Sequence, residues 1–451
     1  MGIIREGDIV RVAIEGYDSD GNGVGRQDGM VLFASGGIRG ETCDVRIRHV
    51  GRSSSAGTVT EVLTPSPARI PPDCPHSHAC GGCQLRHMSY AEELDMKRQR
   101  VTDALRRIGG AELDVSVIHG AKNTERYRNK VQFCVSGGPS GPRIGFYRPR
   151  THVTLDVGDC LLQPEVTSRL RSVFLTWMRQ YHISAYDGRK RQGLIRHLYL
   201  RCNRAGESLC CLMVSGKAVP HEAELVAALR AAEPKLAGVV LGVNEHHNNV
   251  ILGDSYRTLW GDNFLYDTLC GLKFKLSVPS FYQVNSDQAE VLYARALDFA
   301  GLTGTETVVD LYCGIGTISL VLAQKAGTVL GVEVVPEAVL DARENAARNH
   351  ITNAVFLSAD AEAAGQYLLE REIRPDVVCV DPPRKGLSPV VIDAIVQMAP
   401  QRIVYVSCDP GTLARDVRLL GEKGYCLRKA EAVDLFPRTA HVETVTLLEK
   451  V

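Results

Sequence analysis

The sequence lacks several features, and each absence excludes a class of protein. No apolar run approaches the ~18 residues that a membrane-spanning helix needs. Glu6 and Asp8 stand where a secretory signal peptide requires an apolar stretch, so we expect a cytoplasmic protein. There is no internal repeat and no low-complexity tract, which argues against a repeat architecture. What remains is a globular chain of 451 residues, long enough for two to four domains.

The chain also lacks net charge, because Lys plus Arg and Asp plus Glu both number 52. A neutral total gives no general attraction to nucleic acid. The distribution is uneven, since residues 86–150 carry 13 Lys or Arg against 7 Asp or Glu. Tyr127, Phe133, Phe146 and Tyr147 are interleaved with these cations. Such a mixture suits a phosphate backbone and unstacked bases, although a solvated face with ordinary packing aromatics has the same composition.

Fourteen cysteines occur without a secretory signal, which favours metal binding or catalysis over disulfides. Cys74, Cys80 and Cys83 form a C-x5-C-x2-C element. A fourth thiol has to come from farther along the chain, and both Cys134 and Cys160 are available. Four thiolates suit zinc or an iron–sulfur cluster, and the spacing alone does not decide between them.

The first two thirds of the chain predict two domains. Residues 1–65 contain short strand-like runs and glycine-rich turns such as 20–25, which is typical of a small barrel of the OB type. Residues 66–275 begin with a proline-rich linker and predict an α+β domain. Ser89 and Glu92 form a capping box for a helix over 90–108, which is able to pack on the domain that follows. The expected strands are 8–15, 29–33, 42–49 and 57–63 in the barrel and 130–135, 197–202 and 209–214 in the α+β domain, which has one further helix at 220–232.

Residues 276–451 alternate strand-like and helical stretches, the pattern of an open parallel sheet. The sequence thus predicts an α/β, Rossmann-like domain at the C-terminal end. In such a sheet, ligands bind at the edge where the strands have their carboxyl ends. The expected strands are 307–311, 329–334, 354–357, 376–380 and 402–407.

A short glycine loop and several acids fall at that edge. Gly314 and Gly316 follow the first strand and open a helix, so the backbone is able to approach a ligand closely. Glu333 ends the second strand, about where an acid binds ribose hydroxyls. Asp360 follows the third strand and Asp381 the fourth. The pattern indicates a nucleoside-containing ligand.

The charge of the loop indicates which ligand this is. Asp310 opens the loop, and an acid there is unfavourable beside a pyrophosphate but suits a cationic sulfonium. The loop also lacks the G-x-x-x-x-G-K-[ST] pattern of a P-loop nucleotidase. S-adenosylmethionine is therefore favoured over a dinucleotide.

Cys408 follows the fifth strand in the sequence Ser-Cys-Asp-Pro-Gly. A loop cysteine at the ligand edge is able to react, whereas Cys313 lies in the glycine turn and Cys379 within a strand. Beside a sulfonium methyl donor, a thiolate suits methylation of a pyrimidine. Addition of the thiolate to C6 of uracil makes C5 nucleophilic. The C5 proton must then leave, and this requires a general base.

The end of the chain supplies candidates for that base. Strand-like runs at 427–435 and 442–449 are joined by only six residues, too few for a parallel crossover. The last strand is therefore expected to run antiparallel, so that its beginning returns to the ligand edge. Glu443 is the strong candidate for the base and His441 the weaker one.

Taken together, these motifs resemble the bacterial RNA uracil-C5 methyltransferases, specifically the 23S rRNA type that carries an iron–sulfur cluster. The resemblance covers the whole length and includes a TRAM-like barrel over residues 1–65. It implies that Cys408 is the nucleophile and Glu443 the base. It further implies a 4Fe–4S cluster on Cys74, Cys80, Cys83 and Cys160, and S-adenosylmethionine contacts from Gln283, Tyr312, Thr317, Glu333, Asp360 and Asp381.

The resemblance also implies a substrate. The tRNA-type relatives are expected to lack both barrel and cluster, so 23S rRNA is the expected target, within rRNA processing. A flipped or single-stranded uridine would enter between the middle and C-terminal domains of a monomer that binds no membrane. The alternatives are the same chemistry on tRNA, cytosine methylation, and a non-catalytic RNA-binding or ribosome-assembly factor. The position of Cys408 after the fifth strand, rather than in the Asp381-Pro-Pro motif, disfavours cytosine.

Overall fold

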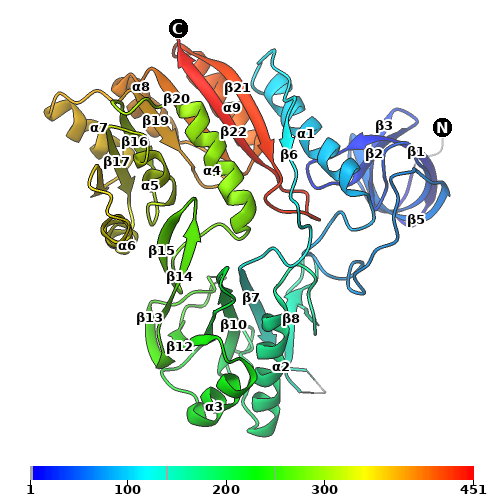
Figure 1. The fold of residues 1–451 in the computed structure, drawn as a ribbon. Coiled ribbons are helices and arrows are strands. Elements are labelled where there is room, and N and C mark those ends of the chain that lie inside the picture. Colours follow the sequence, from blue (N-terminus) through cyan, green and yellow to red (C-terminus); the bar gives the residue numbers. More distant parts are fainter. Residues whose placement is uncertain (1–3, 139–140, 249) are drawn as a thin grey trace.

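The computed structural model describes residues 4–138, 141–248 and 250–451. Figure 1 shows three parts: an N-terminal barrel, a middle sheet with its helices, and a C-terminal sheet covered by helices on both faces. The C-terminal part lies above the middle part in this view, and the barrel lies to one side of both. Within the described residues, no helix is long and apolar enough to span a membrane.

The barrel is closed by five strands in the order β1-β2-β3-β5-β4. One expectation was wrong here, because residues 23–27 form a strand and not the end of a glycine-rich turn. Glycine allows this strand to approach its neighbour, since a Cβ on Gly25 would collide with the backbone carbonyl of Ala13. The strands are β1 (Ile9–Tyr17), β2 (Gly23–Gln27), β3 (Met30–Ser35), β4 (Thr42–Val50) and β5 (Ser54–Thr64).

The middle part is a seven-stranded sheet with two helices on one face. The sequence predicted only one of these helices. The second, α2 (Glu165–Gln180), begins after Pro164 without a side-chain cap, so it has no capping signal in the sequence. The strand order is β13 (Ser255–Gly261), β12 (Leu236–Val243), β11 (Ser208–Val214), β10 (Ile195–Cys202), β7 (Lys130–Ser136), β8 (Arg143–Tyr147), β9 (Thr154–Asp156), and the other helix is α3 (Glu222–Ala232).

A hairpin of β14 (Phe264–Leu269) and β15 (Leu272–Ser277) joins the middle part to the C-terminal part. Leu265 packs with Tyr199 of the middle sheet. Phe274 belongs to the core of the C-terminal part. The hairpin therefore fixes the two parts relative to each other.

The C-terminal sheet has eight strands, and its first five are parallel, as the sequence predicted. The last strand runs antiparallel and inserts between its two predecessors in the chain. The order is β18 (Ala354–Ser358), β17 (Thr328–Glu333), β16 (Thr307–Leu311), β19 (Val377–Val380), β20 (Arg402–Ser407), β22 (Glu443–Lys450), β21 (Tyr425–Val433), β6 (Ile118–His119).

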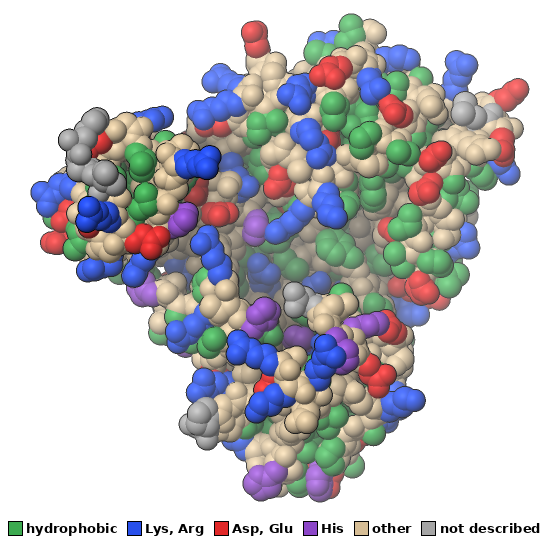
Figure 2. Space-filling view, turned by 180° about the vertical axis from the view of Figure 1, so that it is seen from behind, with side chains coloured by type: hydrophobic (Ala, Val, Ile, Leu, Met, Phe, Trp, Pro, Cys, Tyr) green, Lys and Arg blue, Asp and Glu red, His purple; other side chains and the backbone are tan. Residues whose placement is uncertain are grey.

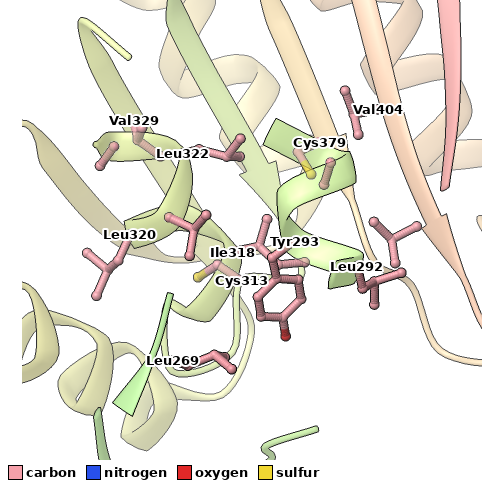
Figure 3. Packing of buried hydrophobic residues seen from close by; sticks show 14 of the residues in the cluster. Leu269, Leu292, Tyr293, Cys313, Ile318, Leu320, Leu322, Val329, Cys379 and Val404 are labelled. Atoms are coloured by element: carbon pink, nitrogen blue, oxygen red, sulfur yellow. The ribbon is translucent and has the colours of Figure 1, made fainter. Parts of the chain in front are cut away.

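Helices cover both faces of this sheet with separate apolar cores. One face carries α4 (Ser286–Ala300), α5 (Thr317–Ala323) and α6 (Pro336–Arg348). Figure 3 shows part of this core, where Tyr293 of α4 lies beside Cys313 and Ile318. The other face carries α1 (Tyr90–Arg107), α7 (Ala361–Glu370), α8 (Pro389–Met398) and α9 (Pro410–Gly421).

Helix α1 belongs spatially to the C-terminal sheet, although it comes early in the chain. Half of the expected capping box is formed, since the Ser89 side chain accepts a hydrogen bond from the backbone N–H of Glu92. The reciprocal bond is replaced, because Ser89 N–H donates to the carbonyl of Ala68 and the Glu92 carboxylate accepts from Tyr17 Oη. A buried ion network adds to the apolar contacts of α1. Lys97 Nζ lies 2.7 Å from Glu93 Oε1 and 2.6 Å from Asp434 Oδ1, and all three side chains are fully buried. The network ties α1 to the residue that follows β21.

Replacing Lys97 with Met should lower the free energy of unfolding of the C-terminal part by about 3–5 kcal/mol, because it removes the cation nearest to two buried carboxylates. Urea unfolding followed by circular dichroism measures this. Arg107→Met on the same helix is the matched control, since Arg107 pairs with Asp103 at an exposed site and should change stability by less than about 1 kcal/mol. Equal effects of the two substitutions would contradict the account of the network.

Candidate active site

The glycine loop after β16 is held against the end of β17. The backbone N–H groups of Tyr312 and Cys313 both donate to the carbonyl of Val332 at 3.0 Å. Tyr312 has φ of 72° and Gly316 has φ of 85°, which is the left-handed region. A Cβ on Gly316 would lie 3.1 Å from Phe356 Cζ, so only glycine opens α5 without displacing this ring.

Glu333 shapes this loop from the end of β17. Its Oε2 accepts a hydrogen bond from Gly314 N–H at 3.1 Å, and its Oε1 accepts one from Val335 N–H at 2.9 Å. The carboxylate is half-buried at the ligand edge. It is therefore fixed in one orientation before any ligand binds, as ribose recognition requires.

Asp310 does not lie where we expected it. The sequence suggested an acid beside a sulfonium, but Asp310 is buried within β16, and its Oδ2 accepts a hydrogen bond from Ser319 Oγ at 2.5 Å. Burial raises its pKa to about 7. The acid at the edge itself is Asp381, whose pKa burial also raises to about 7. A cationic ligand beside Asp381 would favour its ionised carboxylate and so oppose the effect of burial on this pKa.

The remaining expected ligand contacts are spread around the edge. Gln283 is buried before α4, and its backbone carbonyl accepts a hydrogen bond from Asn129 Nδ2 at 2.8 Å. Thr317 is the first residue of α5, with Oγ1 3.3 Å from Tyr293 Oη. Asp360 is exposed after β18, and its Oδ1 accepts a hydrogen bond from Ala363 N–H in α7. None of these three side chains forms a hydrogen bond with another of the three.

Cys408 and Glu443 come together through the pairing of β20 with β22. Ser407 pairs with Thr444 in antiparallel register, so the next position brings Cys408 beside Glu443. Glu443 is 3% exposed, and its Oε2 has no hydrogen-bond partner among the residues that the structure describes. Cys408 is half-buried. An unpartnered buried carboxylate next to a thiol is costly for folding alone, which makes the pair a candidate functional site.

Burial raises the pKa values of both Glu443 and Cys408, and one arginine lowers them. Burial raises the pKa of Glu443 to about 8, the Asp381 carboxylate adds to the effect, and the Arg384 guanidinium opposes it. Burial raises the pKa of Cys408 to about 11, again against Arg384. Arg384 is a candidate functional residue that the sequence analysis did not single out. It directly follows the Asp381-Pro-Pro motif, and that position was the available signal.

His441 is a poor base in this setting. Its Nε2 lies 3.2 Å from Arg384 Nη2. Burial lowers its pKa to about 4, and the cations Arg384 and Arg100 contribute. A group with a pKa near 4 holds an abstracted proton far less strongly than the Glu443 carboxylate does.

The cysteine element lies beside the middle sheet. Cys74, Cys80, Cys83 and Cys160 line one cavity of about 200 Å³. Cys134, the alternative fourth thiol, is buried inside β7 and does not line this cavity. No three His, Cys, Asp or Glu side chains converge on a single metal position within ranges 4–138, 141–248 and 250–451.

The surroundings of this cavity suit an anionic group. The backbone N–H of Gly82 donates to Cys80 Sγ at 3.4 Å. Arg86 and Arg128 also line the cavity. Arg86 Nε and Nη2 and Arg128 Nε are buried without partners in the described part of the chain. Unpartnered guanidinium N–H groups beside four thiols match a thiolate-bound cluster, whose net charge is negative.

Figure 2 shows a hollow between the C-terminal part and the middle part, bordered by Lys, Arg and His side chains. Cations around a concave surface favour the approach of a polyanion.

Alkylation of Cys408 by iodoacetamide should accelerate about tenfold per pH unit up to a pH near 11, because the thiolate is the reactive form. Glu443→Gln removes a carboxylate that raises the pKa of Cys408 and should accelerate the reaction at pH 8. Arg384→Gln should slow it. Peptide-resolved mass spectrometry gives the rates, with Cys426 as the internal control. Identical rates in all three proteins would show that these charges do not act on the thiol.

Along its length, the chain is similar to known RNA methyltransferases. The sequence model of the tRNA (Uracil-5-)-methyltransferase family matches residues 270–451, and that of the TRAM domain matches residues 5–60. An RNA methyltransferase of Clostridium tetani is 40% identical over 446 residues, covering 99% of this chain and 97% of the relative. One of Halalkalibacterium halodurans is 42% identical, covering 99% and 98%.

A similar solved structure is the tRNA (uracil-54, C5)-methyltransferase of Pyrococcus abyssi in complex with S-adenosyl-L-homocysteine. Its TM-score is 0.77 at 25% identity, and the match covers 97% of this chain and 100% of that one. A match of this extent includes the barrel. It overturns the expectation that a barrel separates rRNA enzymes from tRNA enzymes.

Proposed function

The chain belongs to the family of S-adenosylmethionine-dependent RNA uracil-C5 methyltransferases, and on that basis we propose that it methylates C5 of a uridine with Cys408 as nucleophile and Glu443 as general base. The observation that carries the proposal is the juxtaposition of these two side chains by the antiparallel pairing of β20 and β22.

The chemistry follows from the roles of the residues. The Cys408 thiolate adds to C6 of the uracil ring, and the ring becomes an enolate that is nucleophilic at C5. S-adenosylmethionine, when bound, supplies the electrophilic methyl group for C5. Glu443 then removes the C5 proton, and the electron pair of the C–H bond reforms the double bond as Cys408 leaves C6. Arg384 lies near both groups and stabilises the thiolate before it adds to the ring.

S-adenosylmethionine would lie at the carboxyl ends of β16, β17, β18 and β19. The contacts we propose are Glu333 to the ribose and Asp381 near the cationic end, where its carboxylate favours a positive ligand. The full set is Gln283, Tyr312, Thr317, Glu333, Asp360 and Asp381.

Glu443→Gln should lower methylation by a factor on the order of 10²–10⁴, because proton removal by the base is lost. Addition and methyl transfer precede that step, so a covalent RNA–protein adduct should accumulate in this variant. Denaturing gel electrophoresis with labelled RNA detects the adduct. Cys408→Ala is the control and should give neither product nor adduct. Methylation by Cys408→Ala would rule out the covalent route.

The four cysteines of the cavity are proposed to hold a 4Fe–4S cluster. The cavity and the unpartnered arginine N–H groups support this. Methyl transfer moves no net electrons, so a structural or RNA-positioning role is the economical one.

Cys160→Ser should lose iron and acid-labile sulfide when the protein is purified without oxygen, because one of four ligands is removed. Cys134→Ser should retain both, since Cys134 lies outside the cavity. Iron analysis and the visible absorption spectrum measure the difference. Loss of the cluster in Cys134→Ser alone would assign the fourth ligand to that residue instead.

The proposed target is a uridine of 23S rRNA, flipped or single-stranded, which enters at the hollow between the middle and C-terminal parts. A uridine of tRNA is a second candidate, favoured by the extent of the match to the Pyrococcus abyssi tRNA enzyme. Either RNA would be met in the cytoplasm, where we place the protein.

A further inference from the structure

The segment 434–442 connects β21 to β22 and leads directly into Glu443. It has no helix or strand of its own, and Arg438 within it has φ of 69°, in the left-handed region. Within it, Thr439 N–H donates to the carbonyl of Phe436 at 3.2 Å, and the remaining support comes from other segments. Glu443 is the first residue of β22 and pairs with Val433 of β21, so its placement depends on that pairing and on the neighbours that hold the connection before it, which we call the base loop.

One of these neighbours is Arg100, on the face of α1 turned to the base loop. Arg100 Nη1 donates a hydrogen bond to the carbonyl of Ala440 at 2.6 Å, three residues before Glu443. The carboxylates that act on Arg100 are Asp409, next to Cys408, and Asp18 and Asp20 of the barrel. One half-buried cation thus stands between the barrel, the base loop and the loop of the nucleophile.

The barrel reaches the base loop through the turn between β1 and β2, residues 18–22. Asp18 stiffens this turn, because its side chain accepts hydrogen bonds from Asp20 N–H at 2.9 Å and from Asn22 N–H at 2.8 Å. Gly21 has φ of 80°, and a Cβ added to it would lie 3.6 Å from Ala440 Cβ and 2.7 Å from Leu85 Cδ2. The turn is therefore packed against the residue that Arg100 binds.

The segment that follows Cys83 also contacts the base loop. The backbone N–H groups of Gln84 and Leu85 donate to the carbonyl of Arg438 at 3.1 and 3.2 Å. The barrel is also anchored to α1, since Tyr17 Oη donates to Glu92 at 2.7 Å and Arg39 pairs with Asp95 at 2.7 Å. The barrel is in this way part of the support of the base loop.

We propose that Arg100 and the barrel turn 18–22 are positioning elements for the chemical step, holding Ala440 so that Glu443 is aligned with the C5 proton. The inference rests on the proposed role of Glu443 and gives the barrel a task beyond RNA binding. Proton removal is the step that depends on this alignment, because a general base has to reach hydrogen-bond distance of the proton it takes. The base loop reaches the Cys408 thiolate indirectly, through His441, whose Nε2 lies 3.2 Å from Arg384 Nη2, so adduct formation depends on the base loop less than proton removal does.

Arg100→Met should slow single-turnover methylation about tenfold or more, since misplacement of a catalytic group by about 1 Å is able to cost 10²-fold. The affinities for RNA and S-adenosylmethionine should change less than twofold. The rate with [5-²H]uridine RNA should fall further than with unlabelled RNA, because proton removal becomes limiting. Adduct formation with 5-fluorouridine RNA, which has no C5 proton to lose, should remain near the wild-type rate.

Arg106→Met is the matched control, because Arg106 lies on the same helix and pairs with Asp114 at an exposed site. It should behave as wild type in every measurement. Gly21→Ala perturbs the same contact from the barrel side and should also slow methylation with an increased isotope effect. Arg100→Lys should recover part of the rate, since it restores a cation with a shorter reach to Ala440.

Hydrogen exchange provides a readout that needs no activity. The amides of residues 439–443 should exchange faster in Arg100→Met and Gly21→Ala than in wild type and Arg106→Met. Unchanged exchange and rate in both variants would overturn the inference, as would a loss confined to RNA affinity. Failure of the proposed function is distinct, because wild-type protein would then form no 5-methyluridine while the exchange experiment still decides whether the base loop depends on this contact.

Discussion

The antiparallel insertion of β22 between β20 and β21 is the constraint on which the site depends. A strand that continued the parallel pattern would deliver its first residues to the opposite edge of the sheet, far from Cys408. The return of β22 instead places Glu443 next to the position after Ser407. The proposed nucleophile and base, 35 residues apart in sequence, are thereby brought side by side.

This arrangement buries carboxylates close to one another, which is electrostatically unfavourable for the folded protein. Asp381 and Glu443 are carboxylates whose pKa values burial raises, and Glu443 has an oxygen without a partner among the described residues. Such groups destabilise the free protein and are retained where ligand binding or catalysis uses them. Arg384 is the cation that limits the repulsion, and the proposed sulfonium ligand would add a second one. Two contacts hold the chain around this site. A buried ion pair joins Lys97 of α1 to Asp434, and the barrel turn packs against Ala440.

Much of the fold followed from local patterns. The five parallel strands were predictable because each is a short apolar run followed by a helix, and helix α1 because the Ser89 side chain caps its first turn. The return of the last strand followed from the length of its connection. Strand β2 and helix α2 were missed, since Gly23 and Gly25 imitate a turn and Pro164 offers no capping side chain.

The site was predictable only in part, for reasons of tertiary placement. The spacing of cysteines left Cys134 and Cys160 equivalent, and only the burial of Cys134 inside β7 separates them. Asp310 was misplaced, because whether an acid before a glycine loop faces the ligand or the core depends on its partner Ser319. The positions of Arg384 near Cys408 and Glu443 and of Arg100 against Ala440 depend on contacts between segments distant in sequence, which no local pattern encodes.

The central claim is that this chain forms 5-methyluridine in RNA. The most direct measurement incubates the purified protein and S-adenosylmethionine with unmodified 23S rRNA, and separately with unmodified tRNA, then quantifies 5-methyluridine by mass spectrometry after digestion. The account predicts 5-methyluridine in 23S rRNA; product in tRNA alone would retain the mechanism and move the target to the second candidate. Absence of 5-methyluridine from both RNAs, with protein whose cysteine site is loaded, would contradict the account.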